Sequence, residues 1–349
     1  MKVLLYTDVH WSTYSSIVRS RDKYYSTRLD LLIKGMNWAE DLAVKVGCDY
    51  VICAGDFFDK SQVNDEEISA LTEVKWNNLS HFFLVGNHES SVNSLFYNTS
   101  KLLKQDNFFI VNEPYNLSGF GYDILLLPYV SESSREPLKH YWNAARIKAG
   151  AISTNEVKKE IIISHNDIKG VRFGAFESKE GFSVDEIKEN CLLYLNGHLH
   201  NGDWVTDNIL NLGSMSAHNF SNDSFNYDYG CWILDTDTMS LSFYENPYSL
   251  NFYKIEINNT KDIDKLETLK EHSVVALKCN EELLEDVKKK LKDNEKIIEY
   301  KLTIVRNNVA EVDSVEEFSM NHLERFVEFV HSNIGTFDVV LEELAEVCK

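Results

Sequence analysis

Ala54-Gly55-Asp56-Phe57-Phe58-Asp59 follows the apolar run Tyr50-Val51-Ile52-Cys53. A short apolar run that ends in glycine and a carboxylate is typical of a buried strand that stops at the edge of a sheet. The pattern therefore places Asp56 just outside the sheet, where its side chain is available for chemistry.

Four other apolar runs end in polar residues in the same way. They are residues 3–7 before Asp8 and His10, residues 82–85 before Asn87 and His88, residues 161–164 before His165, and residues 192–196 before His198 and His200. In open α/β sheets the ligand site lies beyond the carboxyl ends of the strands. We therefore expect five strands to deliver these side chains to one crevice, with Asp56 at its centre.

The bulk composition indicates a soluble cytoplasmic protein. The chain of 349 residues is long enough for one large catalytic domain and one or two smaller units. No stretch is apolar enough to span a bilayer, and we expect no membrane association. The six cysteines lack the spacing of a metal site, so we expect reduced thiols. The formal charge of -20 is unusual for a protein that binds nucleic acid.

Helical and strand patterns alternate along the first part of the chain, as in a layered α/β domain. Helices are predicted over residues 28–46, 65–79 and 91–104, with Gly47 ending the first and Asn64 or Asp65 capping the second. After Asn246-Pro247, three strands and two helices form a β-α-β-α-β pattern. We predict a catalytic domain over residues 1–247, a capping domain over 248–306 and a helical tail over 307–349.

The tail is acidic and amphipathic, with 2 basic and 10 acidic residues over positions 307–349. Ser314-Val315-Glu316-Glu317 fits a capping box that starts a helix. Two apolar faces at helical spacing suit docking against a partner, although packing on the chain's own domain gives the same periodicity. The residues on these faces are Leu323, Phe326, Val327, Val330, Val340, Leu341 and Leu344.

Basic and aromatic residues alternate in the loop that follows His10. Such a mixture grips phosphates and stacks on bases, but a solvated loop has the same composition. The candidates are Arg19, Arg21, Lys23 and Tyr24.

The convergent residues offer seven candidate metal ligands. A lone histidine at a strand end is more often structural, but five such sets in one chain favour a metal site. Seven ligands are too many for one tetrahedral zinc and suit two ions that share a bridging carboxylate. Mixed nitrogen and oxygen donors favour Mn, Fe, Co or Zn over Ca or Mg. The seven are Asp8, His10, Asp56, Asn87, His165, His198 and His200.

A pair of ions activates a water molecule and clamps the oxygens of an in-line phosphoryl displacement. The pattern therefore predicts hydrolysis of a phosphate ester. His88 follows Asn87 directly, so it lies beside the site and can stabilise the transition state or protonate the departing oxygen. Glu89 is expected to orient it.

In order and spacing, these motifs resemble those of calcineurin-like metallophosphoesterases. Within that superfamily the chain resembles SbcD-type DNA repair nucleases, which work with an SbcC-type ABC ATPase. The resemblance implies a four-layer α/β/β/α sandwich with a small α+β capping domain and a helical tail. It implies one ion held by Asp8, His10, Asp56 and His200, and a second held by Asp56, Asn87, His165 and His198, with His88 as the catalytic histidine.

The resemblance also implies a manganese-dependent DNA nuclease, an exonuclease on duplex ends and an endonuclease on single strands and hairpins, with Mg, Fe or Zn as alternative metals. It implies a homodimer that forms through the helices at 65–79 and 91–104 and that belongs to a heterotetramer with the ATPase. In such a complex the tail binds the ATPase and the capping domain binds DNA. Eukaryotic and archaeal members carry a second histidine at the position of Asp59, whereas bacterial and phage members carry an aspartate, as this chain does. We place Asp59 with His88 in the catalytic site. For a phage-encoded chain the expected location is the host cytoplasm.

The acidic net charge is compatible with DNA binding if positive charge is concentrated locally. Two divalent ions add charge where the phosphate binds, and an ATPase partner can supply further contacts. We expect the isolated chain to bind DNA weakly, through Arg19, Arg21, Lys23, Lys169 and Arg172. The competing hypotheses are a phosphatase, a nucleotidase or cyclic-nucleotide phosphodiesterase, and a non-catalytic scaffold, although a scaffold is expected to lose ligands that are all present here.

Overall fold

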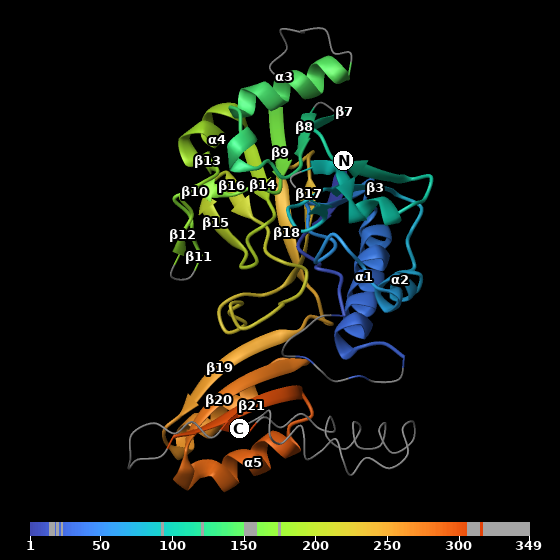
Figure 1. Ribbon diagram of the computed structural model, residues 1–349. Helices are drawn as coiled ribbons and strands as arrows, with labels where there is room; N and C mark the ends of the chain where they lie inside the picture. Colours follow the sequence, from blue (N-terminus) through green and yellow to red (C-terminus); the bar gives the residue numbers. More distant parts are fainter. Residues whose placement is uncertain are drawn as a thin grey trace, which may run out of the picture.

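The computed structural model describes residues 1–13, 18, 21, 24–91, 94–119, 122–149, 159–173, 176–305 and 315–316. Two six-stranded sheets lie face to face above a smaller sheet (Figure 1). Over the described residues, no helix combines the length and the apolar character needed to cross a bilayer.

The first sheet has the strand order β18-β17-β1-β2-β3-β6. Strands β1, β2, β3 and β6 are parallel, whereas β17 pairs antiparallel with β1 and with β18. The bounds are β1 (Lys2–Tyr6), β2 (Tyr50–Cys53), β3 (Ser80–Leu84), β6 (Phe108–Val111), β17 (Gly230–Asp235) and β18 (Ser240–Glu245).

The second sheet has the order β15-β16-β14-β9-β8-β7. Its central strands β16, β14, β9 and β8 are parallel, and antiparallel edge strands flank them. The bounds are β7 (Tyr115–Gly119), β8 (Tyr122–Leu127), β9 (Lys159–Ser164), β14 (Leu193–Asn196), β15 (Asp203–Thr206) and β16 (Ile209–Asn211). The five expected strand ends are thus confirmed, but they are divided between two sheets.

Aliphatic side chains fill the space between the sheets, with Leu5 and Ile52 from the first packing against Leu126 and Leu195 from the second. Helices cover both outer faces. The first face is covered by α1 (Thr27–Val46) and α2 (Asp65–Leu71), and the second by α3 (Leu138–Lys148) and α4 (Val184–Asn190). The predicted four-layer α/β/β/α sandwich is therefore confirmed.

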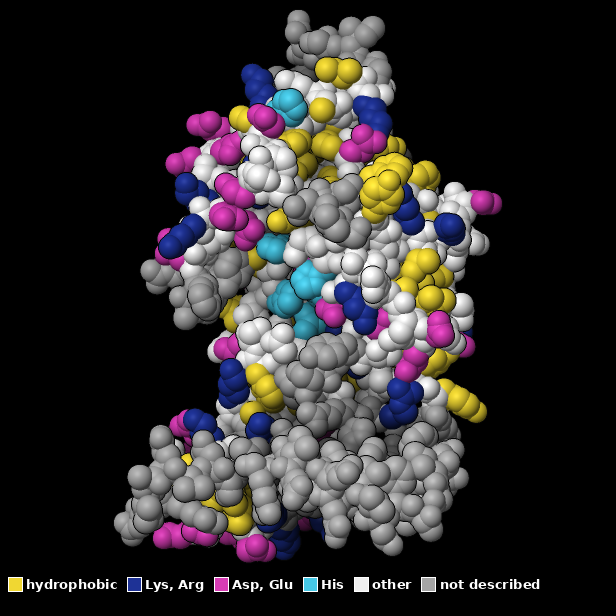
Figure 2. All heavy atoms as spheres, viewed as in Figure 1, with side chains coloured by type: hydrophobic (Ala, Val, Ile, Leu, Met, Phe, Trp, Pro, Cys, Tyr) yellow, Lys and Arg dark blue, Asp and Glu magenta, His cyan; other side chains and the backbone are white. Residues whose placement is uncertain are grey.

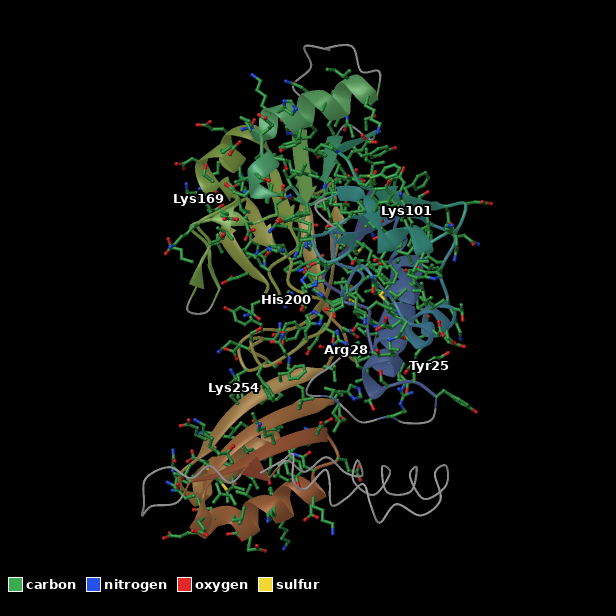
Figure 3. The ribbon with its side chains drawn as sticks, in the orientation of Figure 1. Tyr25, Arg28, Lys101, Lys169, His200 and Lys254 are labelled. Carbon is green, nitrogen blue, oxygen red and sulfur yellow. The ribbon has the colours of Figure 1, made fainter. Side chains whose placement is uncertain are left out.

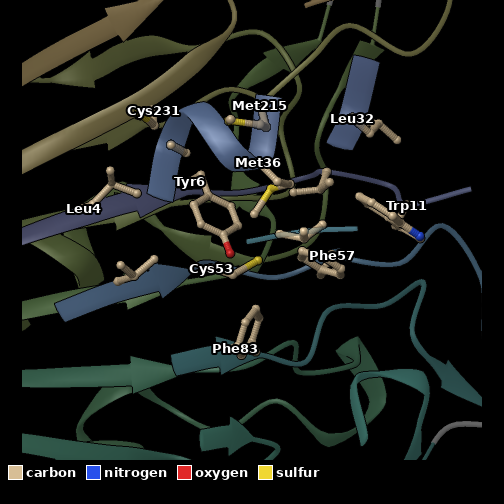
Figure 4. Close-up of a cluster of buried hydrophobic side chains, with 14 of the residues drawn as sticks. Leu4, Tyr6, Trp11, Leu32, Met36, Cys53, Phe57, Phe83, Met215 and Cys231 are labelled. Carbon is tan, nitrogen blue, oxygen red and sulfur yellow. The ribbon is translucent and has the colours of Figure 1, made fainter. Parts of the chain in front are cut away.

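Helix α1 follows from its sequence. The Ser26 side chain caps its first turn by accepting from Leu29 N, and Gly47 ends it in the left-handed conformation at φ 74°. Its apolar face, which includes Leu32 and Met36, packs on the first sheet (Figure 4). This packing fixes the sheet from which three of the five site loops emerge.

The prediction of helices at 65–79 and 91–104 was largely wrong. Helix α2 ends at Leu71. Strands β4 (Ser90–Ser91) and β5 (Ser94–Asn98) pair antiparallel, and the 3-10 helix η1 (Thr99–Leu102) follows β5. The aromatic residues Phe96 and Tyr97 have a high strand propensity, which favours the observed strand over a helix. Of the two helices expected to form a dimer interface, the described residues 65–91 and 94–104 contain only the short α2 and the 3-10 helix η1.

A smaller parallel sheet follows the sandwich. It consists of β19 (Asn251–Ile257), β20 (Ser273–Asn280) and β21 (Ile297–Val305), with η3 (Thr260–Thr268) and α5 (Leu284–Asp293) on one face. This is the predicted β-α-β-α-β pattern, except that the first helix is of the 3-10 type. Phe252 and Leu250 join this unit to the sandwich by packing with Leu31 and Tyr229.

The tail is described only at β22 (Val315–Glu316), which pairs antiparallel with β21. Val315 and Glu316, which the sequence placed at the start of a helix, therefore form a strand. The remaining tail residues, including all seven expected to bind a partner, lie outside the described residues.

Candidate metal centre

The loops after β1 and β2 run side by side and present the first acidic residues. Asp8 N donates to Gly55 O and His10 N donates to Asp56 O, both at 3.0 Å. Asp8, His10 and Asp56 have φ values of 51°, 47° and 50°, a left-handed conformation that costs about 1–3 kcal/mol for a residue other than glycine. Strained backbone at three polar residues in adjacent loops indicates that the fold holds these side chains in one place.

Glycines allow the loops to approach each other closely. A Cβ at Gly86 would overlap the carboxylate of Asp56 and lie 2.6 Å from its backbone nitrogen, and one at Gly197 would lie 2.5 Å from Ala54 O. A side chain at Gly86 would push apart the loops after β2 and β3 of the first sheet, and one at Gly197 would push the loop after β14 away from the first sheet.

Asp56 lies between two groups of histidines. Its Oδ2 is 3.1 Å from His165 Nε2 and 3.8 Å from His10 Nε2, and its Oδ1 accepts from His88 N at 3.0 Å. The same carboxylate oxygen therefore faces both groups, as expected for a bridging ligand.

Asp8, His10 and His200 form the first group. Asp8 Oδ1 is 3.6 Å from His10 Nε2 and 3.7 Å from His200 Nε2. Its Oδ2 is occupied, because it accepts from Thr7 Oγ1 at 2.7 Å and from His198 N at 2.9 Å. Asp8 Oδ1 and His10 Nε2 are buried and have no hydrogen-bond partner. Two facing atoms that can ligate a metal and that lack a hydrogen-bond partner fit a bound cation.

Asn87, His165 and His198 form the second group with Asp56. Asn87 Oδ1 lies 3.3 Å from His165 Nε2 and 3.1 Å from His198 Nδ1. Atoms of Asp56, His165 and His198 lie within 4.8 Å of one another, a spacing that can hold one ion. Figure 2 shows histidine side chains gathered at the centre of one face of the molecule. All seven predicted ligands therefore meet in one place.

Hydrogen bonds fix which nitrogen each ring presents. His165 Nδ1 lies 2.7 Å from Ala54 O and donates to it, so the lone pair is on Nε2. His10 Nδ1 lies 3.0 Å from Asp59 Oδ1, which leaves Nε2 to face Asp8 and Asp56. Such partners orient metal-binding imidazoles.

The electrostatics of the site differ between its histidines: burial lowers the pKa of His200 to about 4, whereas His10 and His165 are shifted the other way by nearby carboxylates. Burial disfavours the imidazolium of His10, but hydrogen bonds to Asp59 and Asp8 and the charge of Asp56 raise its pKa to about 10. Burial also opposes the charged form of His165, whose pKa rises to about 9 because of Asp56 and Asp8.

The carboxylates respond in the opposite direction. Burial raises the pKa of Asp8, but the hydrogen bond to His10 and the charges of His165 and His200 lower it to about 2. The charge and hydrogen bond of His165, followed by the charges of His10 and His88, lower the pKa of Asp56 against burial. In the metal-free protein, the protonated rings of His10 and His165 therefore supply part of the positive charge that metal ions would otherwise bring to Asp8 and Asp56.

Glu89 does not contact the His88 side chain in the way expected from the sequence. Its buried carboxylate accepts from Phe57 N at 2.6 Å, Phe58 N at 3.2 Å and Gly86 N at 2.5 Å. Burial and the charge of Asp56 raise the pKa of Glu89 to about 7. Glu89 therefore joins the loops after β2 and β3, and its effect on His88 is indirect.

His88 is positioned by a backbone carbonyl. Its Nδ1 donates to Asp59 O at 2.8 Å, so its free ring nitrogen is Nε2. Atoms of His88, His10 and Asp56 lie within 4.8 Å of one another, and the His88 side chain is 42% exposed. An exposed imidazole beside a shared carboxylate can reach a bound substrate.

Sequence reasoning missed several residues that support these ligands. Thr7 donates to Asp8, Asp167 lies 3.5 Å from His198 Nε2, and Arg28 and His218 contact the backbone under Asp8 and His10. Adjacency to a ligand could have indicated Thr7 and Asp167. Nothing in the sequence indicates the other two, which reach the site only through tertiary packing.

The predicted DNA contacts are not brought together in the same way. Arg21 is paired with Glu66 at 2.7 Å, Tyr24 is 83% exposed, and Lys169 is exposed on β10 (Ile168–Lys169). Arg172 belongs to β11 (Arg172–Phe173), and the position of its side chain is not described. Arg19 and Lys23 lie outside the described residues.

The family model of calcineurin-like phosphoesterases matches residues 1–202, the segment that carries every candidate ligand. The chain belongs to the calcineurin-like phosphoesterase family. Protein 078R of Invertebrate iridescent virus 3, which carries a phosphoesterase designation, is 26% identical over 181 residues. The match covers 49% of each chain, so this chain aligns with about half the length of that relative.

Two solved structures are partly similar to this calcineurin-like phosphoesterase. A dimetal phosphatase from Danio rerio is 15% identical, with a TM-score of 0.38, over 67% of this chain and 91% of that one. An archaeal phosphodiesterase is 13% identical, with a TM-score of 0.34, over 70% and 99%.

Members of this family hydrolyse phosphoester bonds with two divalent metal ions, and this chain carries candidate clusters for them. His10 and Asp56 belong to these clusters, the unsatisfied Oδ1 of Asp8 faces His10 Nε2 beside them, and the carboxylate of Asp56 is shared by both groups of histidines. The residues present therefore fit the metal pair of a phosphoester hydrolase.

Proposed function

We propose that the chain is a two-metal DNA nuclease of the SbcD type. The observation that carries the chemistry is the position of Asp56 Oδ2 between His165 Nε2 and His10 Nε2. In this proposal Asp8, His10, Asp56 and His200 hold one ion, and Asp56, Asn87, His165 and His198 hold the other. Manganese suits this mixture of imidazole, carboxylate and amide donors.

The metal pair supplies an activated water and a clamp for the phosphate oxygens. The protein supplies geometry and a proton. His88, held by the carbonyl of Asp59, presents Nε2 toward the substrate and protonates or hydrogen-bonds the departing oxygen. Asp59 and Ala54 hold His10 and His165 in the tautomers that expose Nε2.

The proposed substrate is a polyanion because basic side chains flank the site on one face. Lys254 alternates on β19 with Tyr253 and Ile255, which pack toward α5, so it projects from the opposite face of the small sheet. Lys278, exposed on the adjacent strand, lies 3.6 Å from its cross-strand partner Glu256, so its charge is partly balanced and Lys254 is the main basic group here. In the view of Figure 3 Lys169 lies above His200 and Lys254 lies below it. Lysines on both sides of a phosphoesterase centre support a strand of nucleic acid as the substrate.

The role of the tail stays a prediction. Its apolar faces and acidic charge suit an ABC ATPase partner, and homodimerisation within a heterotetramer belongs to the same proposal. Both are tested by adding a candidate ATPase to the assay below.

The deciding experiment is Mn-dependent degradation of end-labelled linear duplex DNA by the purified chain. Asp56→Asn removes the shared charge, and Asp41→Asn on the exposed side of α1 is the matched control. We expect nucleotide release that requires both Mn and Asp56 and is unaffected in the control. A small phosphodiester substrate is assayed in parallel.

Activity on the small ester without activity on DNA, even with a candidate ATPase, would replace the nuclease with a small-substrate phosphoesterase. Hydrolysis of neither substrate would favour a scaffold. DNA cleavage by Asp56→Asn equal to that of the parent chain would contradict the proposed metal site.

A further inference from the structure

A buried arginine lies under the metal centre without an acidic partner. Arg28, in the first turn of α1, is 2% exposed, and none of the described carboxylates lies within ion-pair distance of it. Its Nη2 donates to His10 O at 3.0 Å and lies 3.1 Å from His218 Nδ1. Burying a guanidinium costs free energy, so we ask what Arg28 contributes at this position that offsets the cost.

His218 resembles a further metal ligand at first sight. Its ring lies 4.5 Å from that of His10 and 4.7 Å from that of His200, measured between centroids. Arginine only donates hydrogen bonds, so Nδ1 of His218 accepts from Arg28. Its Nε2 then carries the proton and donates to Asp8 O at 2.9 Å. Both ring nitrogens are occupied by protein atoms, and neither is available to a metal.

The atoms that Arg28 and His218 bind are the carbonyl oxygens of two strained residues. Asp8 and His10 have positive φ values, and their N–H groups already donate to the loop after β2. Their buried carbonyls need donors from elsewhere, and His218 and Arg28 supply one each. The two side chains therefore secure both residues of the turn from below, while Asp8 Oδ1 and His10 Nε2 face the site.

His218 is itself held by a loop that packs on the small sheet. Its backbone N donates to Asn222 Oδ1 at 3.0 Å, and Phe220 packs edge-on against Phe252 of β19 at 5.2 Å. We call Arg28 and His218 together the clamp. It joins three parts of the chain that are distant in sequence, namely the loop after β1, the start of α1 and the loop before β17.

We propose that Arg28 and His218 are positioning residues that hold Asp8 and His10 in the geometry needed to bind the first metal ion. This inference rests on the assignment of Asp8 and His10 as ligands in the proposed function. Residues that orient metal ligands typically change metal affinity by roughly 10- to 100-fold when they are removed.

The test compares variants that differ in their ability to keep the two hydrogen bonds. His218→Gln can donate to Asp8 O through its amide nitrogen and accept from Arg28 through its oxygen, whereas His218→Leu can do neither. His140→Leu, at an exposed position of α3, is the matched control. Mn²⁺ binding is measured on the full chain by calorimetry and by the electron paramagnetic resonance signal of free Mn²⁺.

We expect His218→Leu to weaken one of the two Mn²⁺ sites by roughly 10- to 100-fold, with the other little changed. His218→Gln is expected to restore that site, and the control to leave both unchanged. If the role of His218 is purely structural, His218→Leu should lower Mn²⁺ affinity equally at both sites, or it should lower the unfolding temperature in chelator while Mn²⁺ binding stays normal. Either result would overturn the proposal. If His218→Leu does not fold, His218→Asn gives the same test, because its shorter amide cannot span both partners.

Asp8→Asn separates this inference from the proposed function. If Asp8→Asn retains both Mn²⁺ sites, the ligand assignment itself is wrong, and the clamp falls with it. If Asp8→Asn loses one site while His218→Leu and Arg28→Met retain both, the ligand assignment stands and the clamp is refuted.

Discussion

His10 Nδ1 lies 3.0 Å from Oδ1 of Asp59. This contact places the proton of the ring on Nδ1 and leaves Nε2 to face Asp8 and Asp56. The same residue uses its backbone carbonyl to hold His88 Nδ1 at 2.8 Å. Asp59 therefore acts on a metal ligand through its side chain and on the proposed proton donor chiefly through its backbone carbonyl. Its Oδ1 also lies 3.9 Å from His88 Nδ1, so a side-chain substitution removes this longer contact and keeps the carbonyl one.

Asp59→Ala is expected to weaken Mn²⁺ binding by roughly 10- to 100-fold, because His10 loses the acceptor that orients it. The carbonyl that holds His88 remains, so saturating Mn²⁺ should restore most of the hydrolysis rate on a small phosphodiester. Asp41→Asn serves as the exposed control. A rate that stays low at saturating Mn²⁺ would show that the carboxylate of Asp59 acts on the substrate directly.

His88→Ala should show the opposite pattern. Its removal takes away a proton donor and leaves the seven candidate ligands in place, so we expect a loss of kcat of roughly 10²- to 10⁴-fold with unchanged Mn²⁺ affinity. The loss should be smaller for a p-nitrophenyl ester, whose leaving group needs little protonation. Equal losses for good and poor leaving groups would argue against proton donation by His88.

Mn²⁺ affinity should rise with pH from about 6.5 to about 9. In the metal-free chain the pKa values of His10 and His165 are raised, to about 10 and about 9, although burial opposes both shifts, because Asp59, Asp8 and Asp56 stabilise the charged rings. A metal needs the neutral ring, so each bound ion displaces protons. Calorimetry in buffers of different ionisation enthalpy measures their release, and an affinity independent of pH over this range would contradict the protonated state.

The same shifts determine how the stability of the metal-free chain depends on pH. Both folded-state pKa values lie above the usual value of 6.5. The stabilisation from these histidines is therefore fully present below about pH 6.5 and is lost as the pH rises through about 9 to 10. Urea unfolding in chelator over this range checks the sign.

The strands and the ligands could be predicted because both signals are local. Each ligand directly follows an apolar run, so the end of β2 and the position of Asp56 are read from one stretch. Strands β4 and β5 were predicted as a helix because their apolar residues are too few to separate the two periodicities. His218 gave no signal, since its partners Asp8 and Arg28 are 210 and 190 residues away.

The last prediction concerns a buried pair between α1 and β3. His81 Nε2 lies 3.0 Å from Glu40 Oε2, and both side chains are at most 1% exposed. His81 Nδ1 lies 2.7 Å from Leu79 O, and Trp76 and Phe108 pack around the ring. The pair has no role in the metal centre, so its substitution should change stability and leave Mn²⁺ affinity unaffected.

Glu40→Leu should lower the free energy of unfolding by about 3–5 kcal/mol, because His81 Nε2 is left buried without its acceptor. The double variant Glu40→Leu/His81→Phe should recover part of that loss, since an apolar pair of similar volume leaves no ring nitrogen unpaired, although Asn77 N loses its acceptor Glu40 and Leu79 O loses its donor His81. Glu73→Leu, on the exposed surface, is the control and should change stability by about 0.5 kcal/mol or less. Urea unfolding of the parent chain, Glu40→Leu, His81→Phe and the double variant gives a double-mutant cycle, and strictly additive losses would mean that Glu40 and His81 are not energetically coupled.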